Sequence, residues 1–220
     1  MTEFQDRAVA ALRAAFGLGS DALTVFRRSM EIDYAKWHDG VGYDLDALRR
    51  VPAADHGALY PLLTPPGDWR DVEALAALRT PRADDALREA ARSSTSNEVR
   101  VAVIRTASHL VDDALRIDVL RAAIETATLS DGLIGALDHV ADFHPPPLID
   151  ALLRALRARE SELAYHFAET LARAFGADTS HAEANLRPVF LRFSTPDLSA
   201  RERALRELGE RLGIPLATND

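Results

Sequence analysis

Apolar residues recur every three or four positions over long stretches of this 220-residue chain. The clearest stretch is residues 97–127, in which Val99, Val103 and Ala107 follow one another at helical spacing. Asp112 then interrupts the pattern, and a second stretch of the same kind follows it. Apolar side chains with this period lie on one face of an α-helix, whereas those of a half-buried strand alternate. Residues 97–127 are therefore predicted to form an antiparallel pair of helices.

Capping residues and prolines place the ends of the predicted helices. Asp44, Asp68 and Asn97 each precede a run of helical period, and their side chains can accept a free backbone N–H of the first helical turn. Pro81 is expected at a first helical position, where its missing N–H costs no hydrogen bond. Equivalent helices recur about every 30–35 residues, which is the range of helical repeats. The sequence thus predicts an all-α fold made of repeated helix pairs.

The helix pair in residues 97–127 also has a recognisable motif. The motif consists of Glu98, Val99, Arg100, Ala102, Ala107, Leu110 and Asp112. It resembles a HEAT-like repeat of the bacterial bilin-lyase type. The resemblance implies that the Val and Leu pack in the core and that Arg100 pairs with turn acids of an adjacent repeat. It further implies a right-handed α-solenoid of HEAT-like antiparallel helix pairs. We expect an N-terminal helical cap with an aromatic loop in residues 1–67, and a HEAT-like repeat array with a C-terminal capping helix in residues 68–220.

Aromatic residues concentrate between residues 31 and 48, around the turn Gly40-x-Gly42. A dinucleotide site is not predicted there, because no strand precedes the glycines and no third glycine follows at the required spacing. Partner contacts are expected from Trp37, His38, Asp39 and Tyr43. The alternative is that Trp37 and Tyr43 anchor the N-terminal cap.

The same segment resembles the N-terminal element of a group of bacterial HEAT-repeat proteins associated with toxin–immunity loci. The resemblance rests on Trp37, Gly40, Gly42, Tyr43, Asp44 and Leu45. It implies an immunity protein, which blocks a toxin domain. In such proteins the chain is expected to begin near Met30, so that residues 1–29 are an extension or the product of an upstream start.

The second helix of each predicted pair carries a stripe of charged side chains. The three stripes are Asp85, Arg88 and Arg92; Asp118, Arg121 and Glu125; and Asp150, Arg154 and Arg157. If the pairs stack in register, these stripes lie side by side on one surface, which in HEAT-like arrays is the concave one. They are therefore predicted to contact a partner. The alternative is that they are the solvated faces that every surface helix has.

Charge and composition narrow the class of partner. The net charge is −8, with 34 acidic and 26 basic residues, and the basic residues are scattered. A nucleic-acid-binding protein normally needs a basic stripe to neutralise phosphates, so nucleic acid is disfavoured. A basic protein is favoured, because an acidic surface accelerates its approach. The chain has no cysteine, which excludes disulfides and fits a cytoplasmic protein. No apolar run approaches the roughly 20 residues of a membrane helix.

Candidates for catalysis or metal binding are few. His139, Asp142 and His144 form an H-x-x-D-x-H pattern that offers metal ligands, but its spacing is not that of a zinc helix. His109 and Asp112 can be interpreted as an acid–base pair or as groups at a helix end, and the second interpretation is favoured. No catalytic, cofactor-binding or metal-binding residue is therefore predicted.

Taken together, the sequence predicts a non-catalytic, protein-binding α-solenoid that functions without a cofactor. An immunity protein that neutralises a toxin domain is the favoured instance. The first alternative is an alkylpurine DNA glycosylase, an enzyme with a HEAT-like fold, which would need a basic groove with aromatic residues and a carboxylate facing DNA. The second alternative is a scaffold or lyase accessory factor related to the bilin-lyase repeats.

Overall fold

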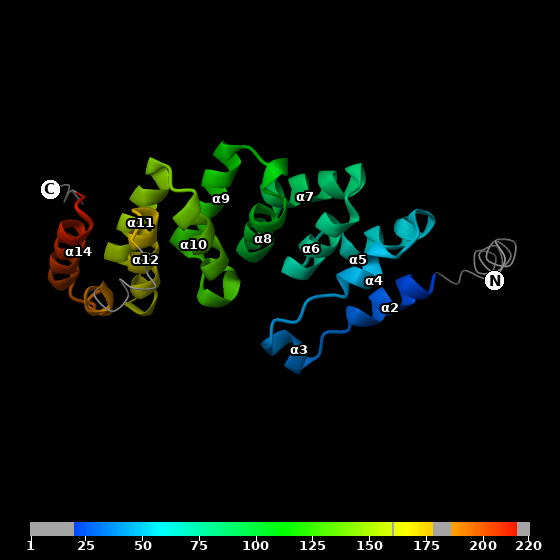
Figure 1. Cartoon of the computed structure of the whole chain (residues 1–220), viewed down its shortest axis with the longest axis horizontal. Coiled ribbons are helices and arrows are strands. Elements are labelled where there is room, and N and C mark those ends of the chain that lie inside the picture. The colour runs from blue at the N-terminus through cyan, green and yellow to red at the C-terminus, as the bar shows by residue number, and fades with distance from the viewer. Residues whose placement is uncertain (1–19, 160, 178–185, 215–220) are drawn as a thin grey trace, which may run out of the picture. The chain divides into compact units, whose positions relative to one another are not determined.

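The computed structural model describes residues 20–159, 161–177 and 186–214. These residues form an all-α structure without a β-strand (Figure 1). The chain divides into two compact units, residues 1–93 and residues 94–220. The boundary expected at residues 67 and 68 thus falls inside the first unit. Residues 1–19 of the predicted N-terminal cap lie outside the described residues.

The first unit contains short helices that lead to two longer ones. The elements are α2 (Asp21–Ser29), α3 (Tyr34–His38), α4 (Leu45–Arg49), a 3₁₀ helix (Ala53–Ala58), α5 (Tyr60–Leu63), α6 (Trp69–Leu78) and α7 (Pro81–Ser93). Helix α2 packs on α4, α4 packs on α6, and α6 packs on α7. Phe26, Leu48 and Leu75 are fully buried in this unit. By contrast, α3 buries none of its residues and lies on a loop that extends away from α4 (Figure 1).

Most of the predicted helix starts in this unit are confirmed. The Asp44 side chain accepts a hydrogen bond from the Ala47 N–H, and Asp68 accepts from the N–H of Arg70, as N-caps do. Pro81 is the first residue of α7. Between α4 and α6 the chain forms a 3₁₀ helix that is followed by α5. Leu59 N–H donates to the His56 carbonyl there, which is the tighter 3₁₀ pattern.

One residue after α6 adopts a strained backbone conformation. Arg79 has φ 50° and ψ 47°, in the left-handed region, where a Cβ crowds the neighbouring carbonyl. Glycine avoids this cost, so Arg79→Gly should raise the free energy of unfolding of the first unit by about 0.5–1 kcal/mol. Both tryptophans, Trp37 and Trp69, lie in this unit, so urea unfolding followed by tryptophan fluorescence measures the effect. The control is Arg50→Gly, because Arg50 ends α4 at φ −88° and its replacement should not stabilise. Equal stabilisation by both variants would contradict the explanation.

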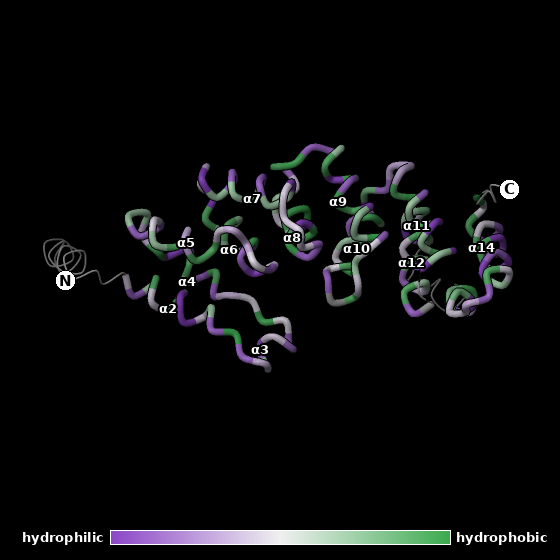
Figure 2. The backbone as a smooth tube through the Cα atoms, turned by 180° about the vertical axis from the view of Figure 1, so that it is seen from behind, coloured by the Kyte–Doolittle hydropathy of each residue, from purple (hydrophilic) through white to green (hydrophobic). Residues whose placement is uncertain are grey.

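The second unit consists of longer helices with mixed hydrophilic and hydrophobic residues (Figure 2). Its elements are α8 (Asn97–Ala107), a 3₁₀ helix (Ser108–Leu110), α9 (Asp113–Thr126), a 3₁₀ helix (Leu129–Asp131), α10 (Leu133–Asp142), α11 (Pro146–Ala158), α12 (Ser161–Ala174), a helical segment at 186–191, and α14 (Leu198–Leu212). The predicted helix pair in residues 97–127 is therefore confirmed as α8 and α9. Asn97 is not the N-cap of α8: the Ser96 side chain accepts from the Val99 N–H, and Asn97 donates to Thr126 instead.

The helices of this unit pack in two rows. Helix α10 lies between α8 and α12, while α11 lies between α9 and α14. The rows contact each other where α9 meets α8 and α10, and where α11 meets α12. From α8 to α12, alternate helices of the chain therefore share a row, which is the packing expected of repeated helix pairs.

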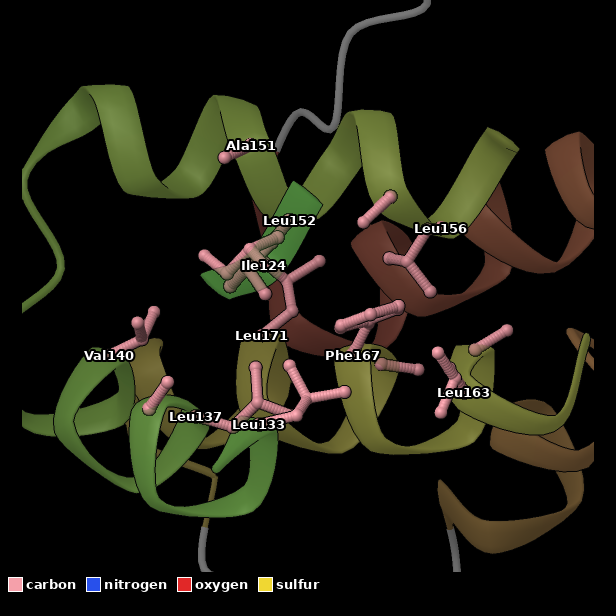
Figure 3. Packing of buried hydrophobic residues seen from close by; sticks show 14 of the residues in the cluster. Ile124, Leu133, Leu137, Val140, Ala151, Leu152, Leu156, Leu163, Phe167 and Leu171 are labelled. Carbon is pink, nitrogen blue, oxygen red and sulfur yellow. The ribbon is translucent and has the colours of Figure 1, made fainter. Parts of the chain in front are cut away.

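A single hydrophobic core runs between the two rows. It includes Ile124 of α9, Leu137 of α10, Leu156 of α11 and Phe167 of α12, all almost completely buried. In Figure 3, Leu156 points down from α11 toward Phe167, which rises from α12. Helical spacing in the sequence accounts for this core, because each helix contributes one apolar face.

Two arginine side chains bind the C-terminal ends of α9 and α11. Arg159, at the end of α11, donates hydrogen bonds to the carbonyls of Ile124 (2.5 Å) and Ala127 (2.6 Å) at the end of α9. Arg201 of α14 donates to the Leu156 carbonyl (3.2 Å) and to two further carbonyls at the end of α11. The last carbonyls of a helix lack intrahelical partners and carry partial negative charge, so guanidinium groups stabilise them. The first contact joins the ends of two helices, whereas the second joins the end of α11 to the first turn of α14.

Candidate functional site

Three aromatic rings lie exposed on α3. Tyr34 is 76% exposed and Trp37 is 61% exposed, which is unusual for such large side chains. The centroid of the Tyr34 ring lies 6.1 Å from that of Trp37 and 6.0 Å from that of His38. These three residues are called the α3 aromatic cluster below. Sequence reasoning missed Tyr34, although its spacing of three and four residues from the other two would have placed it on the same helix face.

The cluster is held by backbone contacts instead of hydrophobic packing. Asp33 caps α3 by accepting from the Lys36 N–H at 2.9 Å, and Lys36 Nζ donates to the Glu31 carbonyl at 2.7 Å. Val41 N–H donates to the Lys36 carbonyl at 2.9 Å and closes the turn after the helix. The Val41 carbonyl in turn accepts from Arg70 Nε at 2.8 Å. The loop is therefore fastened at both of its ends, while its aromatic side chains remain exposed.

Arg70 is the anchor of this loop. Its side chain is 4% exposed, and Nη1 forms an ion pair with Asp68 Oδ2 at 2.9 Å. Its guanidinium carbon also lies 4.6 Å from the centroid of the Trp69 ring. Sequence analysis did not select Arg70, because its partner Val41 lies 29 residues away and nothing in the local pattern indicates the contact.

Tyr43 is placed differently from the other residues predicted in the loop. Its hydroxyl donates to Asp71 Oδ1 at 3.1 Å, and its ring packs edge-on against Phe26 with centroids 5.9 Å apart. Burial and the neighbouring carboxylates of Asp71 and Asp68 raise the pKa of Tyr43. Burial also raises the pKa of Asp71, although the Gly67 N–H donates to its carboxylate and opposes the shift. Trp37, His38 and Asp39 are exposed together, whereas Tyr43 connects the loop to the interior of the unit.

The surroundings of the cluster are acidic. Residues 31–48 contain five carboxylates, at Glu31, Asp33, Asp39, Asp44 and Asp46, and one lysine, Lys36. Asp39 Oδ1 lies 3.0 Å from His38 Nδ1, directly beside the rings. Residues 31–39 alone contain three of these carboxylates against the single ammonium of Lys36, so the local charge next to the rings is negative. Exposed aromatic faces next to carboxylates favour cationic groups.

The charged stripes are largely paired within the protein. In the second unit, Asp118 pairs with Arg121 along α9 at 2.8 Å. Glu125 of α9 pairs with Arg154 of α11 at 3.1 Å, so two predicted stripes lie on adjacent helices and contact each other. Exposed pairs of this kind contribute about 0–1 kcal/mol each. They connect neighbouring helices and leave fewer charges for a partner.

The other charged residues of the three stripes take no part in the contact between Glu125 and Arg154. Arg157 of α11 pairs with Glu202 of α14 at 2.6 Å, and Asp150 is exposed near the start of α11. The stripe of Asp85, Arg88 and Arg92 belongs to α7 in the first unit. There Asp85 and Arg88 pair at 2.9 Å, while Arg92 is exposed.

The histidine candidates do not form a metal site. The His144 Nδ1 atom lies 3.0 Å from the Ala141 carbonyl, as at a helix end. Asp112 caps α9 by accepting from the Leu115 N–H at 2.8 Å, which supports the helix-end interpretation of that residue. Within residues 20–159, 161–177 and 186–214, no group of three or more His, Asp or Glu side chains could hold a metal ion.

His139 should make the stability of the second unit depend on pH. Burial is the main reason why its pKa lies below the ordinary 6.5, and Arg116 and Arg105 lower it further, while Asp142 and Asp138 oppose them. Below about pH 6.5 the unfolded chain therefore binds more protons than the folded one. We expect the free energy of unfolding to fall as the pH decreases from about 7 toward the lowered pKa.

The variant His139→Gln should reduce this pH dependence. Urea unfolding followed by circular dichroism at about pH 7 and pH 5.5 measures it. The control is His109→Gln, because His109 is exposed and its replacement should leave the wild-type difference intact. An unchanged pH dependence in His139→Gln would contradict the assignment.

Searches of protein-family models, of curated proteins and of solved structures found no match to this chain. The resemblance to HEAT-like repeats and to immunity proteins therefore remains a prediction from the residues quoted above. Among the described helices, none combines the length and the apolar character that crossing a membrane requires.

Proposed function

We propose that this chain is a non-catalytic protein-binding α-solenoid, built from HEAT-like helix pairs with right-handed winding, and that the α3 aromatic cluster contacts its partner. The observation that carries the proposal is the exposure of Tyr34 and Trp37 on a helix that buries nothing. Tyrosine and tryptophan dominate the binding energy of protein interfaces, because they bury a large area at little cost in conformational entropy.

The arrangement of the second unit supports a repeat protein. Its two rows of helices, in which each helix contacts its neighbours in the row, agree with stacked helix pairs.

Charge supports a basic protein as the partner. The chain has a net charge of −8, and the residues around the α3 aromatic cluster are predominantly acidic. An immunity protein that covers a basic toxin domain is the instance that agrees with the resemblance of residues 31–48. Complementary charge would direct the approach of the two proteins and increase the association rate.

An affinity capture from the host cell tests the proposal. The tagged full-length chain, treated with nuclease, should retain a defined basic protein, which mass spectrometry identifies. The double variant Tyr34→Ala/Trp37→Ala should lose at least about 90% of it, since removing a central aromatic residue typically costs 2 kcal/mol or more. The matched control is Val25→Ala/Leu62→Ala, which removes two exposed apolar side chains elsewhere in the same unit.

Two outcomes would count against this function. Equal retention by the aromatic and control double variants would exclude the α3 aromatic cluster as the contact. Retention of DNA by untreated samples, without a protein partner, would favour the glycosylase alternative.

A further inference from the structure

We propose that the α3 aromatic cluster binds a cationic side chain, arginine or lysine, of a basic segment in the partner; this inference rests on the proposed function. The ring of Tyr34 neighbours both that of Trp37 and that of His38, with interplanar angles of 33° and 37°. Rings at these angles form a continuous aromatic surface instead of closing against each other. A guanidinium group stacks on such a surface through its planar face, and an ammonium group lies over a ring centre.

The carboxylates nearest the rings complete a site for a cation. Asp39 follows His38 directly, its side chain is exposed, and its Oδ1 lies within 3.0 Å of the His38 ring. Asp33 stands one residue before Tyr34, at the start of α3. A cation stacked on the rings could therefore pair with a carboxylate at either end of the helix. Such a combination is stronger than either contact alone, because the ion pair and the aromatic contact share one desolvated group.

The only lysine of the segment does not occupy this surface. Lys36 Nζ donates to the Glu31 carbonyl, on the chain that precedes α3. Arg70, the other nearby cation, is buried and already bonded to Asp68 and Val41. Within residues 31–48 the carboxylates therefore outnumber the one lysine, and the ammonium of that lysine is bonded to a backbone carbonyl.

Charge excludes two other occupants of the surface. A second copy of the chain would bring another acidic loop against the first, and like charges at short distance repel. An anionic lipid surface meets the same repulsion, since membrane-docking helices carry lysine or arginine on their polar face. A basic segment is the occupant whose charge matches the exposed carboxylates.

A titration with matched peptides tests the inference on the full-length chain. The probes are a Gly/Ser peptide carrying several arginines and the same peptide with each arginine replaced by citrulline, which keeps the shape but lacks the charge. The indole N–H signals of Trp37 and Trp69 are followed by NMR and assigned with Trp37→Phe. The arginine peptide should shift the Trp37 signal and leave that of Trp69 unchanged, while the citrulline peptide should bind at least about tenfold more weakly.

Two variants separate the aromatic from the electrostatic contribution. Trp37→Leu keeps an apolar side chain and should abolish detectable binding of the arginine peptide, measured by calorimetric titration because this variant lacks the Trp37 indole signal. Asp39→Asn keeps the shape of the side chain and should weaken binding about three- to tenfold. The control Asp46→Asn removes a carboxylate of the same loop that is paired with Arg49, and it should change the affinity less than twofold.

The outcomes distinguish this inference from the proposed function. If the citrulline peptide binds as well as the arginine peptide, or if neither shifts Trp37, the cation site is wrong, even where the captured partner still depends on Tyr34 and Trp37. If the arginine peptide binds but the Tyr34→Ala/Trp37→Ala variant retains the captured partner as well as the wild type does, the proposed function of the cluster is wrong. Shifts of Trp37 with protein concentration or with anionic vesicles would overturn the choice of occupant.

Discussion

Replacing Phe167 with alanine is expected to lower the free energy of unfolding of the second unit by about 3–5 kcal/mol. Phe167 is fully buried in the middle of α12, and α12 packs on both α10 and α11. Its ring fills the space between the two rows beneath Leu156 (Figure 3). Removing the ring loses its transfer from water and leaves a cavity that the surrounding helices can close only in part.

Urea unfolding followed by far-UV circular dichroism measures this loss. Tryptophan fluorescence serves as an internal reference, because both tryptophans belong to the first unit. The matched control is Phe175→Ala, one residue beyond the end of α12, where the side chain is 40% exposed. It should cost about 1 kcal/mol or less. Equal costs at the two positions would show that the row-to-row core does not stabilise this unit as described.

Replacing Arg201 with methionine is expected to cost about 2–4 kcal/mol. Arg201 is 5% exposed, and its Nη1 donates to the carbonyls of Leu156, Arg157 and Arg159, while its Nε donates to Thr195. Methionine keeps much of the apolar contact of the side chain but donates no hydrogen bond. The carbonyls at the end of α11 would then lose their donors within a buried region, and unsatisfied buried acceptors are costly.

Hydrogen exchange locates this effect. Amides in the last turn of α11 and the first turn of α14 should exchange faster in Arg201→Met, before those in α8 do, because the lost contacts join only α14 to α11. The control is Arg203→Met on the same helix, since Arg203 is exposed and its nearest carboxylate oxygen, on Asp197, is 3.9 Å away. It should change stability by less than about 0.5 kcal/mol. A uniform increase in exchange across the unit would contradict a local role for Arg201.

The predicted contact residues show which features the local spacing of residues predicts and which it does not. Trp37 and His38 are exposed as expected, and Tyr34 belongs beside them by the same helical spacing. Tyr43 is only six residues from Trp37, yet its hydroxyl bonds to Asp71, which is 28 residues further along the chain. Only the packing of α6 near the loop decides that Tyr43 faces the interior of the unit and that Trp37 is exposed. Their roles in binding remain predictions.

The charged stripes likewise contain one ion pair that local spacing predicts and one that it does not. Spacing within α9 already implies that Asp118 and Arg121 are neighbours, and they do pair. Spacing says nothing about Glu125 and Arg154, which pair because α9 and α11 lie next to each other in one row. The neighbouring helix determines which group a long charged side chain pairs with. A stripe of charged residues that resembles a binding surface can therefore be paired within the protein.

The sequence by itself determined which segments are helical and where several of them begin. Helical period buries one face, and a capping side chain such as that of Asp44 or Asp68 bonds to an N–H two or three residues away, so both signals are local. Tertiary structure alone decided that Arg70 and Arg201 are buried and that Tyr43 faces inward. The partners of these residues lie 28 to 45 positions away along the chain, and proximity over such separations is created only when the helices pack.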